Sequence, residues 1–358
     1  MKWDESKVRL IEALSNAPGP SGFEDEVGKV VRSAAGFLGR IEEDSMRNLY
    51  LYRKEHAGNK PVIMLDAHAD EVGLMVQAIK PNGTLRFLEI GGWAYGCLPS
   101  AAVLVRNALG EYIPGVVAMK PPHFATAGEK PALDASSLVI DIGATSKQEA
   151  EEVFHIRIGE PVVSASKCHF DEANGLFFGK AFDDRIGVAS LLTTLERLDG
   201  QDLPCDIVGV ISSQEEVGDR GVKVAVNKVN PDIAICFEGC PADDTFTEEY
   251  MIQTAMKKGP MIRHMDKSII CNPRFQRYTM AIAEEVGLPL QTAVRAGGGN
   301  NGAAISLSGK GVPVIVMGIP VRYIHAMNCI TSYQDFDTAA ALVTTLCQKI
   351  DESVIGSF

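Results

Sequence analysis

The chain has 358 residues, of which 46% are hydrophobic and 22% charged, a composition typical of a globular protein long enough for two domains. Lysine and arginine total 34 against 46 aspartates and glutamates, and the resulting net charge of −12 disfavours binding to a nucleic-acid backbone. No apolar run approaches the roughly 20 residues that span a membrane, and the N-terminal segment lacks the apolar core of a signal peptide. We therefore expect a cytoplasmic protein whose partners include neither nucleic acid nor a membrane.

Alternating helix and strand patterns run along most of the chain. Apolar spacing predicts a helix over 6–17, then a turn and a second helix that opens with Ser21 and Glu24 as a capping box. Helical patterns also cover 185–198 and 274–287. Continuous apolar runs predict buried strands at 61–70, 205–216, 231–239 and 311–320. This alternation predicts an α/β domain, a mixed and mostly parallel sheet with helices on both faces.

Residues 71–164 have a different pattern. Short β-type runs are interrupted by glycine, proline and asparagine, and the one helical stretch is short, at 146–154. We expect a small inserted β-rich domain at 71–164, while 1–70 and 165–358 form the α/β domain.

Histidines and carboxylates follow the predicted buried strands. In an open parallel sheet, ligands bind beyond the carboxyl ends of the strands, so these side chains are expected at one sheet edge. A further acid pair, Asp183 and Asp184, precedes the helix that starts near Arg185. The first three strands end with His68 and Asp70, with Glu215 and Glu216, and with Glu238, and the last strand is followed by His325.

Taken singly, each of these features has an ordinary explanation as a helix cap, a hydrogen-bonded histidine or a solvated loop. Their convergence on one edge favours a metal site instead. Two histidines and three carboxylates carry −3, which two divalent cations and one hydroxide neutralise. Imidazole and carboxylate ligands favour zinc, cobalt or manganese, and a two-metal site activates water for hydrolysis.

Four motifs, LDAHADEVGLMV, GKAFDDRIG, SSQEEVGDRG and GIPVRYIHA, resemble in order and spacing those of metallopeptidase family 42. This family contains the glutamyl and deblocking aminopeptidases and the tetrahedral aminopeptidases. The stretch GATSKQEAEEVFHIRIGEPV also resembles the family's insertion domain, so the similarity covers nearly the whole chain.

The resemblance implies a phosphorylase/peptidase-like α/β fold with a PDZ-like or barrel-like insertion. It implies an aminopeptidase that removes N-terminal residues from short peptides with two divalent ions, zinc or cobalt first and manganese third. In the implied site, His68 and His325 each bind one ion, Asp183 bridges the two, and Glu216 and Glu238 complete the ligand sets. Glu215 is then the general base and Asp70 orients the His68 imidazole. Relatives assemble through the insertion into dimers and then tetrahedral dodecamers.

The chain departs from the family pattern at two places. Glu238 stands where the third metal carboxylate is more often aspartate. In RAGGGNNGAAIS, Asn300 and Asn301 replace the Thr-Asp of the usual Gly-Gly-Thr-Asp-Ala, which removes a negative charge.

Several alternatives remain at this stage. One is a metal-dependent deacylase, or a glucanase, a label that some relatives carry. Another is a catalytically impaired metal-binding scaffold, and a third is a cysteine hydrolase that uses Cys168 with His169. The glycine-rich stretch lacks the Lys-Ser/Thr of a phosphate loop, and Cys236 with Cys240 is better explained as two buried thiols than as a soft-metal pair. Sequence leaves the preferred N-terminal residue of the substrate open.

Overall fold

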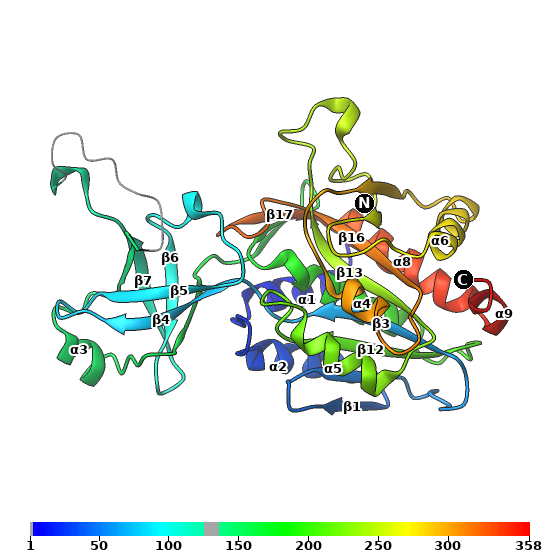
Figure 1. Ribbon diagram of the computed structural model, residues 1–358, viewed down its shortest axis with the longest axis horizontal. Coiled ribbons are helices and arrows are strands. Elements are labelled where there is room, and N and C mark those ends of the chain that lie inside the picture. Colours follow the sequence, from blue (N-terminus) through cyan, green and yellow to red (C-terminus); the bar gives the residue numbers. More distant parts are fainter. Residues whose placement is uncertain (1–2, 125–135) are drawn as a thin grey trace.

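A computed structural model describes residues 3–124 and 136–358 and shows two parts joined side by side, an α/β domain and a small barrel (Figure 1). The longer helices all belong to the α/β domain. The helices are α1 (Glu5–Asn16), α2 (Asp25–Ala34), α3 (Lys147–Glu152), α4 (Phe182–Arg197), α5 (Arg220–Val229), α6 (Pro273–Glu285), α7 (Asn301–Ser306), α8 (Tyr333–Lys349) and α9 (Glu352–Ile355). Single 3-10 turns lie at Tyr95–Cys97, Pro122–Phe124 and Glu249–Met251.

The sheet of the α/β domain has the order β1-β2-β12-β3-β13-β16-β17-β11-β10, and β14 and β15 extend it beside β16. Pairing is parallel among the central strands β12, β3, β13 and β16, and antiparallel towards both edges. Its strands are β1 (Arg40–Glu43), β2 (Leu49–Tyr52), β3 (Val62–His68), β10 (His169–Asp171), β11 (Leu176–Gly179), β12 (Asp206–Ser212), β13 (Ile233–Pro241), β14 (Met261–Met265), β15 (Gln291–Val294), β16 (Val314–Arg322) and β17 (Cys329–Ser332).

The predicted mixed α/β sheet is confirmed, and its parallel part is the set of four strands that the apolar runs predicted. These strands are mostly apolar because both faces are covered, with Asp66 and His68 on β3 and Glu238 on β13 as polar exceptions. All seven residues of β12 are buried. Helices α1, α4 and α8 share one core cluster with the sheet, and α5 and α7 share another with its opposite face. The antiparallel edges arise from hairpins that lack long apolar runs.

The inserted domain is a closed β-barrel with strand order β4-β5-β8-β7-β6-β9. Leu74, Phe87, Val105, Ile140 and Val162 belong to its separate apolar core. Closure removes the exposed sheet edges that such short strands would otherwise leave unpaired. Its strands are β4 (Gly73–Ile79), β5 (Leu85–Ile90), β6 (Ala102–Arg106), β7 (Tyr112–Ala118), β8 (Val139–Asp141) and β9 (Pro161–Ser164).

The predicted capping box at the start of α2 is wrong. Helix α2 begins at Asp25, and its N-cap Glu24 makes no side-chain capping hydrogen bond. Ser21 Oγ instead donates to Asp70 Oδ2 at 2.6 Å, and Glu24 Oε1 accepts from the main-chain N–H of Gly22 at 2.8 Å. A buried carboxylate from another element competes successfully for the serine hydroxyl, which local sequence spacing does not reveal.

Within the described residues, we find no helix that is both long enough and apolar enough to cross a bilayer.

Candidate metal centre

The ends of the central strands bring the predicted site residues to one region. His68 is the last residue of β3, and His325 lies in the turn between β16 and β17. Glu238 lies inside β13, which continues to Pro241 rather than ending at Glu238 as expected from the sequence. Parallel pairing of β12 with β3 sets Ser212 opposite His68, so the segment after β12 starts beside this histidine.

Two groups of side chains have ligand atoms close enough to hold a metal ion, and they share Asp183. One group is His68, Asp183 and Glu238, and the other is Asp183, Glu216 and His325, with the ligand atoms in each within 4.8 Å of one another. The Oδ1 atom of Asp183 lies 3.1 Å from His68 Nε2, and its Oδ2 atom lies 3.3 Å from His325 Nε2. His325 Nε2 also lies 3.3 Å from Glu216 Oε2.

The chain leaves β geometry after Ser212, and this lets the adjacent glutamates both reach the site. Gln214 has a φ of 55°, in the left-handed region. The main-chain N–H of Glu215 then donates to Asp70 Oδ1 at 2.9 Å, and that of Glu216 donates to Asp70 Oδ2 at 3.2 Å. His68 Nδ1 lies 3.3 Å from the same Oδ1. Asp70 therefore fixes the main chain of both glutamates as well as one histidine.

The Asp183–Asp184 pair opens α4 in non-helical backbone conformations, with a cis peptide bond between the two. The buried Asp184 accepts main-chain N–H groups of His68 at 3.1 Å, Gly187 at 3.0 Å and Gly239 at 2.9 Å. It thus ties β3, α4 and β13 together behind the metal groups. A Cβ on Gly239 would lie 2.4 Å from the main-chain oxygen of Phe182, so this close approach requires glycine.

The buried carboxylates and imidazoles of the site suit a bound cation. Burial raises the pKa of Glu215, Glu216 and Glu238 above the usual carboxyl value. Burial lowers the pKa of His325, but hydrogen bonds to Asp183 and Glu216 outweigh it and raise the pKa to about 11. The three carboxyl groups therefore favour their neutral form and His325 favours its cationic form, and both preferences reduce the negative charge of the cluster.

Unpartnered oxygens support a metal at this place. Glu216 Oε1 and Glu238 Oε2 are buried and have no hydrogen-bond partner within the part of the chain that the structure describes. A buried carboxylate oxygen without a partner is costly, and a cation held in each group would satisfy the oxygen of that group. The imidazole and carboxylate donors suit zinc, cobalt or manganese.

A buried ion cluster beside the site was missed by the sequence reasoning. Lys180 Nζ donates to both carboxylate oxygens of Glu71 at 2.6 and 2.7 Å, and Arg185 Nη2 lies 3.4 Å from Glu71 Oε1. Arg185 also donates to the main-chain oxygens of Leu14 at 2.7 Å and Ala69 at 2.6 Å. The available signal was that Glu71 directly follows Asp70, while Lys180 lies three residues before Asp183 and Arg185 two residues after it.

Asn301, which stands in place of the family's aspartate, hydrogen-bonds a buried carboxylate. Asn301 Nδ2 donates to Asp66 Oδ2 and to Ser212 Oγ, both at 2.8 Å. Asp66 is fully buried on β3, two residues before His68, and burial raises its pKa to about 6. The Asn301 side chain carries no charge, and the carboxylate at this place is that of Asp66. Asn300 caps α7 by accepting from the N–H of Gly302 at 2.9 Å.

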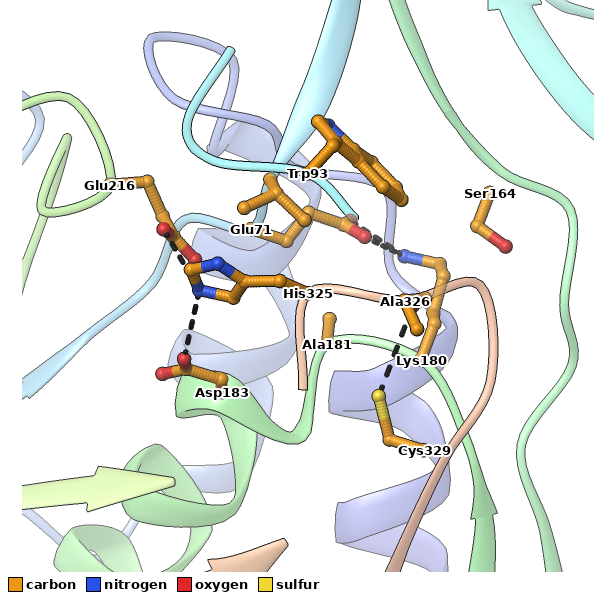
Figure 2. A pocket seen from close by; sticks show the side chains of 11 residues that line it. Glu71, Trp93, Ser164, Lys180, Ala181, Asp183, Glu216, His325, Ala326 and Cys329 are labelled. Carbon is orange, nitrogen blue, oxygen red and sulfur yellow. Dashed lines mark hydrogen bonds and ion pairs between the residues drawn. The ribbon is translucent and has the colours of Figure 1, made fainter. Parts of the chain in front are cut away.

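A loop of the barrel covers the metal groups. A Cβ on Gly91, which has a φ of +74°, would lie 3.3 Å from Glu216 Oε2, and one on Gly92 would lie 3.7 Å from His325 Nδ1. The next residue, Trp93, lines a small pocket that Asp183, Glu216 and His325 also line (Figure 2). The barrel therefore contributes directly to the surroundings of the site.

The proposed cysteine nucleophile is not activated. Cys168 is buried, and burial raises the pKa of its thiol to about 12. His169 is exposed and stacks on Phe178, with ring centroids 5.2 Å apart. The two side chains have different surroundings, so the structure does not support a cysteine hydrolase.

Comparison with known proteins identifies the family. The site and fold are those of a hydrolase with a buried histidine and carboxylate centre in an α/β domain. The model of the M42 glutamyl aminopeptidase family matches residues 48–342, and the chain belongs to this family of metalloaminopeptidases. It is 31% identical over 348 residues to the glutamyl aminopeptidase of Lactococcus lactis subsp. cremoris, covering 97% of both chains. It is 28% identical over 350 residues to the lysyl aminopeptidase of Pyrococcus furiosus, covering 95% of this chain and 96% of that one.

Solved structures support the same assignment. The TET aminopeptidase of Thaumarchaeota archaeon SCGC AB-539-E09 superposes with a TM-score of 0.94 at 33% identity, over 98% of both chains. The Pyrococcus horikoshii TET1 peptidase, which can assemble into a tetrahedron or a large octahedral shell, gives 0.86 at 26% identity, over 96% of this chain and 100% of that one. The structure PhTET1-12s, a dodecamer, gives 0.85 at 26% identity, over 96% of this chain and 99% of that one.

Proposed function

We propose that this protein is a two-metal aminopeptidase that removes N-terminal residues from short peptides. The observation that carries the proposal is that two ligand groups share the carboxylate of Asp183, whose two oxygens lie next to different histidines. Such sharing suits two cations held close together.

In this proposal His68, Asp183 and Glu238 hold one cation, and Asp183, Glu216 and His325 hold the other. The cations are zinc or cobalt, with manganese as a third candidate. When bound, two such ions lower the pKa of a water molecule and stabilise negative charge that develops on a carbonyl oxygen.

Glu215 is assigned as the general base. Its Oε2 atom lies 3.9 Å from His68 Nε2, so the carboxylate lies beside the metal groups without belonging to either. Burial raises the pKa of Glu215, which increases its ability to accept and hold a proton. Glu215 would take a proton from the attacking water and deliver it to the nitrogen of the leaving peptide. Asp70 would keep Glu215 and the His68 ring in position.

A Glu215→Gln variant tests this assignment. We expect it to bind as much metal as the natural protein and to lose at least about 1,000-fold in kcat, because glutamine cannot accept the proton. Glu216→Gln is the matched control, since the same change one residue along should reduce bound metal. The measurements are elemental analysis of metal content and peptide hydrolysis in zinc, cobalt and manganese. Undiminished hydrolysis by Glu215→Gln would disprove the base assignment.

The same assays separate the alternatives. A metal-binding scaffold would bind the ions yet cleave none of the peptides, whatever their N-terminal residue. A glucanase that uses carboxylic acids alone would keep activity on a glucan after chelation. Intact Glu215 beside the metal groups favours catalysis, because a scaffold needs ligands but no base.

We also propose that residues 71–164 form the dimerisation domain and that dimers build a dodecamer. Exposed apolar side chains on the barrel support this, notably Leu109 at 64% exposure and Ile158 at 70%. Leu109→Glu and Ile158→Glu should lower the native mass, and Val224→Glu, on an exposed face of α5, is the control. A native mass unchanged by both barrel variants would contradict the barrel's role. The cytoplasmic location stays a prediction.

A further inference from the structure

Side chains from distant segments hold the turn that carries the proposed base. The four consecutive main-chain N–H groups of 213–216 each donate to a side-chain oxygen. The first donates to Asn48 Oδ1 at 3.0 Å, and the second donates to Glu24 Oε1 at 3.2 Å. The third and fourth donate to the two carboxylate oxygens of Asp70. Turn 213–216 is therefore fixed by the residue before β2, the N-cap of α2 and the chain just after β3.

The backbone of turn 213–216 is unusual and depends on these bonds. Gln214 has a φ of 55°, in the left-handed region that residues other than glycine rarely adopt. This conformation ends the β geometry in which the side chains of Glu215 and Glu216 would point to opposite faces. On the other side of the turn, the carbonyl oxygen of Glu215 accepts from the N–H of Gly218 at 2.8 Å. Acceptors for the N–H groups thus stabilise the conformation that brings both glutamates to the site.

Glu24 is the acceptor for the residue in the left-handed conformation. Glu24 is 5% exposed, and its Oε1 atom also accepts from the main-chain N–H of Gly22 at 2.8 Å. Its Oε2 atom is buried and has no hydrogen-bond partner among residues 3–124 and 136–358. The bond to Gln214 therefore depends on a single oxygen, and its removal would leave the N–H of Gln214 without this acceptor.

The segment that contains Glu24 also supports Asp70. Ser21 Oγ donates to Asp70 Oδ2 at 2.6 Å, and the same oxygen accepts from the N–H of Glu216 at 3.2 Å. The segment 21–24 thus acts on the turn twice, directly through Glu24 and indirectly through Asp70. Glu24 belongs to neither metal group, so it acts on the site through the turn and not as a ligand.

We infer that Glu24 is a positioning residue for the proposed general base, because its hydrogen bond to Gln214 holds the turn that directs Glu215 toward the metal groups. The inference rests on the proposed aminopeptidase function. This role requires only a hydrogen-bond acceptor, so glutamine should replace Glu24 and alanine should not. A displaced base slows proton transfer, whereas the metal ligands and the substrate remain bound.

Hydrogen exchange of the zinc-loaded protein tests the hold on the turn without catalysis. Glu24→Ala removes the acceptor, and Glu24→Gln keeps an oxygen that can accept the same N–H groups. The fragment that covers 213–216 should exchange at least about 10-fold faster in Glu24→Ala, and no faster than the natural protein in Glu24→Gln. Glu26→Ala is the control and should leave this exchange unchanged, because Glu26 pairs with the exposed Lys29 at 2.7 Å. If Glu24→Ala fails to fold, Glu24→Met takes its place, since it fills similar space without an acceptor.

Kinetics of the zinc-loaded proteins test the positioning role. The substrate is the aminoacyl 4-nitroanilide that the natural protein hydrolyses fastest. Glu24→Ala should lower kcat by about 30-fold while KM and bound zinc stay within about 2-fold, because Asp70 and His325 still hold Glu216. Glu24→Gln should keep at least about half of the natural kcat. In a Glu215→Gln background, Glu24→Ala should lower the residual kcat no further, because the two residues act as one unit.

The possible results separate the inference from the function on which it rests. Unchanged exchange at 213–216 in Glu24→Ala would overturn the inference. So would a loss of kcat that Glu24→Gln shares, that follows a loss of zinc, or that multiplies with the loss caused by Glu215→Gln. Faster exchange in Glu24→Ala, with no peptide or anilide cleaved by the natural protein, would support the hold on the turn while refuting the aminopeptidase function.

Discussion

Exchange of Asp66 and Asn301 tests whether a single buried carboxylate is required beneath the metal site. In the natural chain one carboxylate and one amide face each other at 2.8 Å, and both residues are at most 1% exposed. Asn301→Asp places two carboxylates at this distance, Asp66→Asn removes the charge, and the double variant restores one carboxylate and one amide with their positions exchanged.

Repulsion between two carboxylates determines the expected loss of stability in Asn301→Asp. Two unit charges 2.8 Å apart repel by about 6 kcal/mol at an effective dielectric constant of about 20. Uptake of a proton or local movement relieves part of this, so we expect a loss of about 3 kcal/mol in the free energy of unfolding. For a chain of 358 residues that corresponds to a fall in Tm of about 4 °C. Asp66→Asn loses one charge-assisted hydrogen bond and should cost about 1 to 2 kcal/mol.

Thermal unfolding of the metal-free proteins at pH 8 measures the three variants. The double variant should be more stable than Asn301→Asp by at least about 2 kcal/mol, because Ser212 Oγ can donate to the new carboxylate as readily as it accepts from the amide. Asn82→Asp is the control, since the exposed Asn82 accepts hydrogen bonds from Thr84 with its Oδ1, which a carboxylate oxygen can also do. Losses that simply add in the double variant would refute the reasoning.

Two further predictions concern single residues near the site. Burial, followed by the charge of Asp70, raises the pKa of Glu24 from 4.5 to about 7. Protonated Glu24 therefore favours the folded state below pH 4.5, and this stability is lost as the pH rises through about 7. Glu24→Gln should be more stable than the natural metal-free protein by about 1 to 3 kcal/mol at pH 8 and equally stable at pH 4.5, by urea unfolding. A gain that is the same at both pH values would exclude titration of Glu24 as the cause. Gly239→Ala forces a Cβ against main-chain atoms of Phe182 and Asp183 and should lower zinc affinity at least about 10-fold by calorimetry. Gly28→Ala on α2, where the nearest atom is 3.8 Å away, should leave affinity unchanged; equal affinities in all three proteins would contradict the packing argument.

The central sheet could be predicted because its signal is local. Strands β3, β12, β13 and β16 are buried on both faces, so each is a mostly apolar run, and the helices between these runs indicate parallel pairing. The order β12-β3-β13-β16 was not predicted. The antiparallel edges and the order of the barrel strands could not be predicted in the same way. Their strands are short and partly exposed, and pairing partners are set by contacts between distant segments.

The candidate site was likewise predictable in part from the sequence. The sequence by itself determined which side chains stand at the carboxyl ends of the strands, and the structure brings His68, Asp183, Glu216, Glu238 and His325 into two groups there. Only the tertiary structure shows which hydrogen bonds hold these side chains in place, because the donors to a buried carboxylate such as Asp70 come from segments that are distant in the sequence. Asp70 takes the N–H groups of Glu215 and Glu216 and the hydroxyl of Ser21, and Asp66 takes the amide of Asn301.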